Sequence, residues 1–196
     1  MQTVEIIAMA ERRKVIRATD LEEIGASRTL LPYLAEKGAL RRITRGAYAP
    51  SDYVPEHETF LEIAAAVPRG VVCLLSALQF HEITTQMPLE GWVAIERGRY
   101  MPATHGTPIR IVKFSGPAFM EGIEEHDIGG ITVRIYSPAK TIVDCFKFRN
   151  RIGLDVAREA LLDALEQKKT SRDEIWRYAK CCRMSNVMRP YLEMVT

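Results

Sequence analysis

Residues 25–50, GASRTLLPYLAEKGALRRITRGAYAP, combine an amphipathic segment, turn glycines and a concentration of positive charge. The leucines of the first half form one apolar stripe, which predicts a helix that begins near residue 28 and ends at Gly38. The second half predicts two short strands around a turn at Arg45-Gly46, ending at Pro50. The stretch carries one acid, Glu36, and five basic residues: Arg28, Lys37, Arg41, Arg42 and Arg45.

Two further helices are predicted before this stretch. TVEIIAMAERRKV (3–15) has apolar residues on one side and charges on the other. ATDLEEIGAS (18–27) predicts a short helix that is capped by Thr19 or Asp20 and ends at Gly25. Pro32 fits the third helix only within its first turn, where a missing N–H costs nothing. Three helices and a basic hairpin in fifty residues are the order of a winged helix-turn-helix, which we expect over residues 1–50.

Residues 51–196 predict a second domain of mixed α+β class with helices at its end. The boundary falls in APSDYVPE (49–56), which is polar and holds two prolines. HETFLEIAAAVP (57–68) is helical, and GVVCLLSALQFHEITT (70–85) begins as a buried apolar run and continues as a helix. Strands are predicted at WVAI (92–95), IRIVKF (109–114) and ITVRIY (131–136). Ser137 with Pro138 and Ser171 with Glu174 mark the starts of later helices.

The composition is that of an ordinary globular protein, with 47% hydrophobic and 27% charged residues in 196. The sequence has neither the apolar run of a signal peptide nor one long enough to span a membrane, so we expect a cytoplasmic protein with no membrane partner. The cysteines and histidines lack ligand spacing, so we expect no metal and no cofactor. Asp144, between two apolar residues, is interpreted as a structural hydrogen-bonding acid.

Charge is distributed unevenly along the chain, although its total is only +2. Residues 1–50 carry a net charge of +3, residues 51–133 one of −6, and residues 134–196 one of +5. Opposite signs attract different partners, so we expect the partners to differ from one end of the chain to the other.

The basic N-terminal segment has the residue types that read DNA. The second helix of a helix-turn-helix presents short polar and long basic side chains opposite its core stripe. The hairpin arginines suit phosphate oxygens or the minor groove. The candidate contacts to double-stranded DNA are Ser27, Arg28, Thr29, Tyr33, Lys37, Arg41, Arg42 and Arg45. The alternative interpretation is a solvated basic face on a small α+β unit.

The same residues carry a family resemblance. SRTLLPYLAEKGALRRITRGAYAP resembles the N-terminal winged-helix module of AbiEi-type antitoxins from bacterial abortive-infection, or type IV, toxin–antitoxin systems. LLSALQFHEITTQMP followed by WVAI, and then YSPAKTIVDCFKFRNRIGLDVAREAL, resemble the C-terminal domain of that family. The resemblance spans roughly residues 5–165 in the family's order.

The resemblance implies that the two domains have different functions. The N-terminal domain would bind inverted repeats in its own promoter and repress the operon. The C-terminal domain would counteract a nucleotidyltransferase-like toxin, with or without a stable complex. The implied DNA contacts are Arg28, Thr29, Tyr33, Arg41, Arg42 and Arg45, and no single residue is implied for neutralisation. Because one fifty-residue module makes few contacts, we expect two copies on the DNA.

The end of the chain offers a second basic surface. Its candidate residues for a nucleic acid or an acidic protein are Lys140, Lys147, Arg149, Arg151 and Arg158. Structurally, Arg and Lys are also the ordinary exposed residues of amphipathic helices. The sequence alone does not choose between these interpretations.

The sequence contains only weak matches to catalytic motifs. Glu166–Lys168 with Asp155 or Asp163 upstream imitates a nuclease metal site, but these residues lie in a strongly helical run rather than at strand ends. Ser76 and His81 share a predicted helix without further support for a nucleophile and base. We therefore predict no enzyme activity. Two alternatives to a repressor–antitoxin remain: a plain winged-helix transcriptional regulator, and a protein-interaction module without specific DNA binding.

Overall fold

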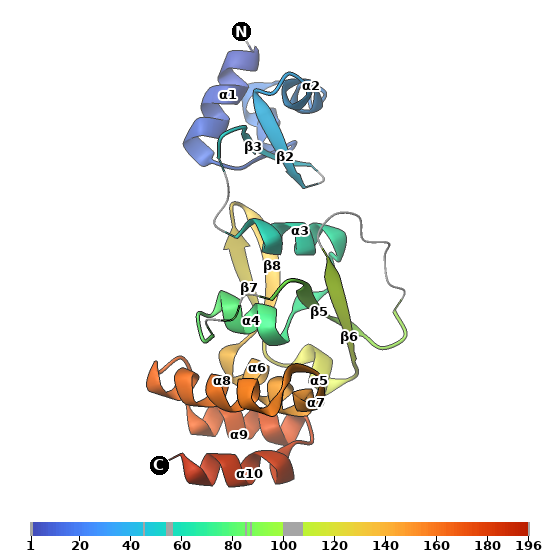
Figure 1. The fold of residues 1–196 in the computed structure, drawn as a ribbon. Helices are drawn as coiled ribbons and strands as arrows, with labels where there is room; N and C mark the ends of the chain where they lie inside the picture. Colours follow the sequence, from blue (N-terminus) through green and yellow to red (C-terminus); the bar gives the residue numbers. More distant parts are fainter. Residues whose placement is uncertain are drawn as a thin grey trace. The chain divides into compact units, whose positions relative to one another are not determined.

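The computed structural model describes residues 2–44, 46–53, 57–84, 86, 88–99 and 108–195. These residues form an α+β protein with one three-stranded and one five-stranded sheet (Figure 1). Their contacts group into two compact units. The first comprises Met1–Ala65 and His126–Val133, and the second Ala66–Glu125 and Arg134–Thr196.

The first unit begins with six elements that follow one another closely. They are α1 (Gln2–Arg13), β1 (Ile16–Arg17), the 3-10 helix η1 (Asp20–Ile24), α2 (Leu30–Glu36), β2 (Leu40–Thr44) and β3 (Ala47–Pro50), after which α3 (Glu58–Ala66) follows. The three strands are antiparallel and lie in the order β1-β3-β2. The predicted hairpin around residues 45 and 46 is thus confirmed as the pair β2–β3.

The boundaries of these helices have local causes. Gly25 adopts a left-handed conformation (φ 61°) directly after η1, as predicted for the end of the second helix. The third helix begins at Leu30, two residues later than expected. This start places Pro32 at the third helical residue, within the first turn, where no intrahelical acceptor is needed for its missing N–H.

A compact core holds this module together. Ile6 and Met9 of α1 pack with Leu31 and Leu34 of α2 and with Tyr48 of β3, all of them buried. Two leucines of the predicted stripe are therefore confirmed as core residues, and the opposite face of α2 is left exposed.

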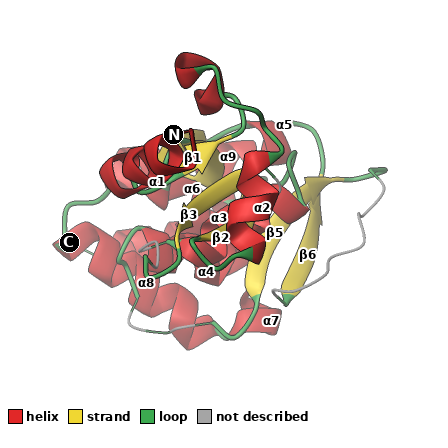
Figure 2. Cartoon of the chain, turned by 90° about the horizontal axis from the view of Figure 1, so that it is seen from above, coloured by secondary structure: helices red, strands yellow, loops and turns green. Residues whose placement is uncertain are grey.

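The second unit contains a five-stranded sheet and most of the helices. Its elements, with those of the hairpin that both units share, are β4 (Val71–Val72), α4 (Leu74–Phe80), β5 (Gly91–Glu96), β6 (Ile109–Phe114), α5 (Pro117–Met120), β7 (Ile123–Ile128), β8 (Ile131–Tyr136), α6 (Pro138–Lys147), α7 (Arg149–Ile152), α8 (Leu154–Glu166), α9 (Arg172–Cys181) and α10 (Ser185–Met194). The strand order is β6-β5-β4-β8-β7, and β5 and β6 run parallel side by side (Figure 2). The sequence had not predicted β1, β4, β7, α5, α7 or α10.

The central helix of this unit is α6. Ser137 caps it by accepting a hydrogen bond from the Lys140 N–H, and Pro138 occupies its first position, as predicted. Eight of its ten residues are buried. In the described part of the chain, no helix is both long and apolar enough to cross a lipid bilayer.

One residue of α6 corrects an expectation from the sequence. Lys140 was a candidate surface residue, but both it and Asp144 are 0% exposed, and the two side chains form an ion pair one helical turn apart. The Lys140 ammonium also lies 4.1 Å from the ring centre of Tyr136 and 4.8 Å from that of Phe114. Because a buried charge must be paired, Lys140 belongs to the core and to no outer surface.

Breaking this pair is expected to destabilise the protein strongly. Lys140→Met and Asp144→Asn should each lower the free energy of unfolding by about 3–5 kcal/mol, because each leaves a buried charge without its partner. The double variant should lose no more than the worse single variant, since neither uncompensated charge remains.

Urea unfolding of the four proteins measures this coupling. Arg99→Ala, which breaks the exposed Arg99–Glu96 pair, is the control and should change stability by less than about 0.5 kcal/mol. Additive losses in the double variant would contradict a paired, charged Lys140.

Candidate nucleic-acid interface

Tyr33 on the exposed face of α2 and Lys37, which follows the end of that helix, lie one turn apart. Tyr33 is 48% exposed, and the Lys37 ammonium lies 5.8 Å from the centre of its ring. Residues at i and i+4 are neighbours on a helix surface, so the helix itself sets this contact. The phenol offers a hydroxyl and a flat ring beside a cation, a combination that can contact both a base edge and a phosphate.

The turn before α2 holds the short polar residues of the predicted interface. Ser27, Arg28 and Thr29 are all exposed. The Ser27 and Thr29 hydroxyl oxygens are 2.8 Å apart, and Ser27 also accepts from the Thr29 N–H at 3.4 Å. Arg28 forms an ion pair with Glu22 of η1, and both side chains are largely exposed. Such a pair contributes little to stability, so Arg28 can exchange Glu22 for another anion at small cost.

The hairpin arginines have different surroundings. Arg42 is exposed, and its Nε donates to the Thr44 carbonyl at 3.3 Å. Arg41 is half-buried and forms an ion pair with Glu58 of α3, so a carboxylate already occupies its guanidinium. Arg45 lies outside the described residues.

The register of the hairpin explains this difference. Arg41 pairs with Ala49 and Arg42 with Tyr48, and an irregularity in the pairing follows between Arg42 and Thr44. Neighbouring residues of a strand point to opposite faces, so the two arginines lie on different sides of the sheet. Arg41 lies on the side where Glu58 of α3 binds it, whereas Arg42 lies on the opposite side and is exposed to solvent.

The structure therefore brings together a smaller interface than the sequence predicted. Its exposed members are Ser27, Arg28, Thr29, Tyr33, Lys37 and Arg42. Within the described residues, Lys37 and Arg42 form no ion pair with a carboxylate, whereas Arg28 and Arg41 do. The geometry can contact one anionic backbone through separate cations and present hydroxyls and a phenol between them.

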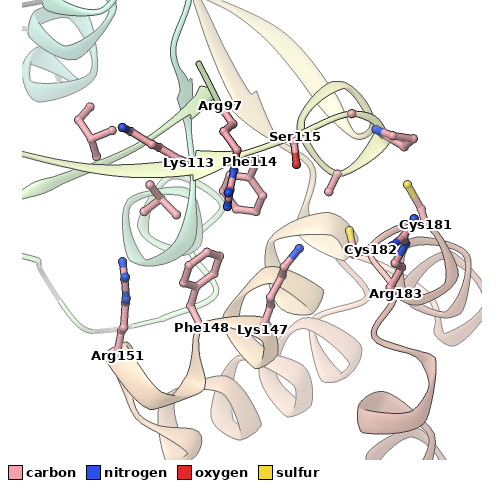
Figure 3. Close-up of a pocket in the computed structure, with 15 residues that line it drawn as sticks. Arg97, Lys113, Phe114, Ser115, Lys147, Phe148, Arg151, Cys181, Cys182 and Arg183 are labelled. Carbon is pink, nitrogen blue, oxygen red and sulfur yellow. The ribbon is translucent and has the colours of Figure 1, made fainter. Parts of the chain in front are cut away.

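The C-terminal candidates separate into two groups. Lys147 and Arg151 are exposed and line one pocket of the second unit (Figure 3). Arg149 is half-buried and donates to the Phe146 carbonyl at 2.8 Å, and Arg158 is exposed on α8 away from that pocket. Three further cations that the sequence analysis had not named line the same pocket: Arg97, Lys113 and Arg183.

The residues that imitated catalytic patterns have structural roles. Ser76 is buried and accepts a hydrogen bond from the Trp92 N–H at 2.9 Å, while His81 Nε2 lies 2.8 Å from the Tyr136 carbonyl oxygen. Asp144 is confirmed as a buried structural acid. Glu166 ends α8, as its helical interpretation required. Among the described side chains, no group of three or more His, Cys, Asp or Glu residues is arranged to hold a metal ion.

Comparison with known proteins gives a family for the N-terminal segment and a fold for the whole chain. The structure is similar to the crystal structure of the RV2827C protein from Mycobacterium tuberculosis, with a TM-score of 0.61 and 11% sequence identity over 97% of this chain and 77% of that one. At this identity the likeness is one of fold. No protein of curated function matches the sequence.

A family model described as "Transcriptional regulator, AbiEi antitoxin" matches residues 5–51. These residues contain every described member of the candidate interface. The resemblance inferred from the sequence is thus confirmed: over residues 5–51 the chain is similar to the AbiEi antitoxin family of transcriptional regulators.

Proposed function

We propose that this protein is the DNA-binding antitoxin of a bacterial type IV toxin–antitoxin system, which represses its own operon through residues 1–50. The observation that carries this proposal is the coincidence of three features in one segment. Residues 5–51 match a family of antitoxin transcriptional regulators, they form the first six elements of the chain, and they present the exposed polar and basic face of α2.

The order of these elements supports a winged helix-turn-helix. In this interpretation η1, the turn at Gly25 and α2 form the helix-turn-helix, and the β2–β3 hairpin is the wing. The N-terminal residues of a recognition helix contact base edges. Base contacts are therefore assigned to the segment from Ser27 to Tyr33, and phosphate contacts to Lys37, Arg42 and Arg45, whereas Glu58 holds Arg41.

Two copies on an inverted repeat follow from the size of this interface. Each released counterion contributes to the salt dependence, so about four phosphate contacts per module, with Arg41 held by Glu58, give a slope of log affinity against log salt near −4. Such contacts alone provide weak, non-specific affinity at physiological salt. Two modules on half-sites one or two helical turns apart add their contacts and read a palindrome.

Residues 51–196 form the antitoxin part in this proposal and counteract a nucleotidyltransferase-like toxin. The support for this role is the resemblance of LLSALQFHEITTQMP and YSPAKTIVDCFKFRNRIGLDVAREAL to the family's C-terminal domain. Neutralisation is assigned to no single residue and to no catalytic step. A repressor that binds its promoter acts in the cytoplasm.

Preferential binding to the operator is the central test. We expect the full-length protein to bind promoter DNA of its own operon at least about tenfold more tightly than a scrambled duplex in fluorescence anisotropy. Lys37→Ala and Arg42→Ala should weaken binding to both duplexes and reduce the salt slope by about one each. Thr29→Ala should instead reduce the preference between the duplexes.

Lys168→Ala is the matched control for these variants, because Lys168 is an exposed cation in the second unit. Equal and weak binding to both duplexes would contradict operator recognition and favour a protein-interaction module. Titration to a plateau on an intact repeat gives the stoichiometry, where one copy per repeat would contradict paired half-sites.

Release of Arg41 should strengthen DNA binding. Glu58→Gln removes the carboxylate that holds Arg41, so the freed guanidinium should increase DNA affinity about threefold and raise the salt slope by about one contact. Glu11→Gln removes the same charge from the exposed face of α1 and leaves the Arg41–Glu58 pair in place. If both variants have the same effect, general charge accounts for it and Arg41 reaches no phosphate.

Repression and neutralisation should be separable. Expressed from a foreign promoter, the Lys37→Ala/Arg42→Ala double variant should rescue growth from the toxin encoded next to this gene as well as the unchanged chain does. Its repression of a reporter under the native promoter should be lost. A chain that binds the operator without any rescue would instead be a plain transcriptional regulator.

A further inference from the structure

The second unit contains a pocket of about 990 Å³ whose walls come from three parts of the fold. One wall is the end of β6 and the turn into α5, with Arg97 just beyond β5. The second is the junction of α6 and α7, and the third is the end of α9. In Figure 3, Arg97 reaches into the pocket from the strand side, while Lys147 and Arg151 reach toward it from the helices.

Every charged side chain that lines this pocket is a cation. They are Arg97, Lys113, Lys147, Arg151 and Arg183. No ion pair joins any of them to a carboxylate in the described parts of the chain, whereas Arg99 and Arg110, on and near the same strands, are paired with Glu96 and Glu90. A concave site lined by one sign of charge concentrates ligands of the opposite sign, so this pocket attracts a polyanion.

The pocket also contains an aromatic floor. The rings of Phe114 and Phe148 meet edge to face with their centres 5.4 Å apart. Lys147 Nζ lies 5.6 Å from the first ring centre, and the Arg151 guanidinium 5.7 Å from the second. Phe148 is only half-buried, so part of its surface faces the pocket. Stacking on an exposed aromatic ring stabilises a planar base, and the neighbouring cations bind phosphates.

A backbone hydrogen bond holds Arg97 next to this floor. The Arg97 N–H donates to the Phe114 carbonyl at 2.6 Å, which fixes the backbone of Arg97 beside the ring.

A volume near 1,000 Å³ is that of a site for a small molecule. Cations that face one another across a cavity surround a compact ligand, whereas a nucleic-acid backbone follows cations along an open groove.

We propose that this pocket binds a free nucleotide that carries two or three phosphates, with its base against Phe148 and its phosphates among the five cations. Binding alone is proposed. Burial raises the pKa of the Cys182 thiol to about 11, so this pocket-lining sulfur is protonated at neutral pH and is not a nucleophile. The proposal is independent of DNA binding by residues 1–50.

The conformation of Arg183 provides a clean variant. Arg183 follows the end of α9 with φ 59°, a left-handed conformation in which glycine is the usual residue. Arg183→Gly therefore removes a pocket cation without backbone strain. Lys168 has the same conformation (φ 55°) just beyond α8 and does not line the pocket, so Lys168→Gly is its matched control.

The test is isothermal titration calorimetry of the full chain in EDTA with ATP, GTP, AMP, inorganic tripolyphosphate and a single-stranded oligonucleotide as probes. We expect ATP or GTP to saturate one site per chain, with AMP and tripolyphosphate each at least about tenfold weaker. Arg183→Gly should weaken nucleotide binding about tenfold, the effect of one charge-assisted hydrogen bond. Lys168→Gly should leave it unchanged.

Four results would overturn the proposal. The first two are the absence of saturable nucleotide binding and equal losses in Arg183→Gly and Lys168→Gly. Tripolyphosphate that binds as tightly as ATP would show a polyanion site without base recognition. Displacement of ATP by a much lower concentration of the oligonucleotide would identify a nucleic-acid groove instead.

Discussion

The second unit depends on one buried ion pair, between Lys140 and Asp144 of α6. Burial raises the pKa of the Asp144 carboxyl and Lys140 opposes that shift, so the two charges need each other inside the core. The backbone around the pair is shaped to cover it. A Cβ on Gly122 would lie 2.7 Å from the Lys140 Cβ, and Gly122 has a φ of 76°, so glycine is required where the turn before β7 covers the lysine stem.

The same pair connects the core to the pocket. Phe114 lies under Lys140, its ring centre 4.8 Å from that ammonium, and it also contributes to the pocket floor. Three residues after Asp144, α6 ends at Lys147, which points toward the pocket beside Phe148 (Figure 3). Both partners belong to α6, so their burial follows from the packing of α6 in the core, and the same packing sets the place of one pocket cation and one ring. Burial of this pair and exposure of Lys147 are therefore two consequences of a single helix placement.

The sequence predicted helix caps and turns correctly. The caps at Ser137 and Ser171 and the turn at Gly25 were found because each depends on a few adjacent residues. The expectation of an exposed Lys140 is wrong because an acid one turn later in an apolar run is the pattern of a buried pair. The pocket was missed because its cations come from distant segments. Two of them, Arg97 and Lys113, lie in the stretch with a net charge of −6.

Net charge along the sequence therefore says little about where charge is free in the fold. The N-terminal segment is rich in basic residues, yet Glu22 of the same segment neutralises Arg28, and Glu58 of α3, beyond it, neutralises Arg41. The exposed pair with Glu22 opens at small cost, whereas the half-buried pair with Glu58 also holds β2 against α3. Among the described residues of this interface, Lys37 and Arg42 form no ion pair with a carboxylate. A phosphate has to displace Glu22 to bind Arg28, and Glu58 to bind Arg41. The affinity of the interface for a single half-site is then low, and specificity comes from the number of modules that bind together rather than from the charge of one.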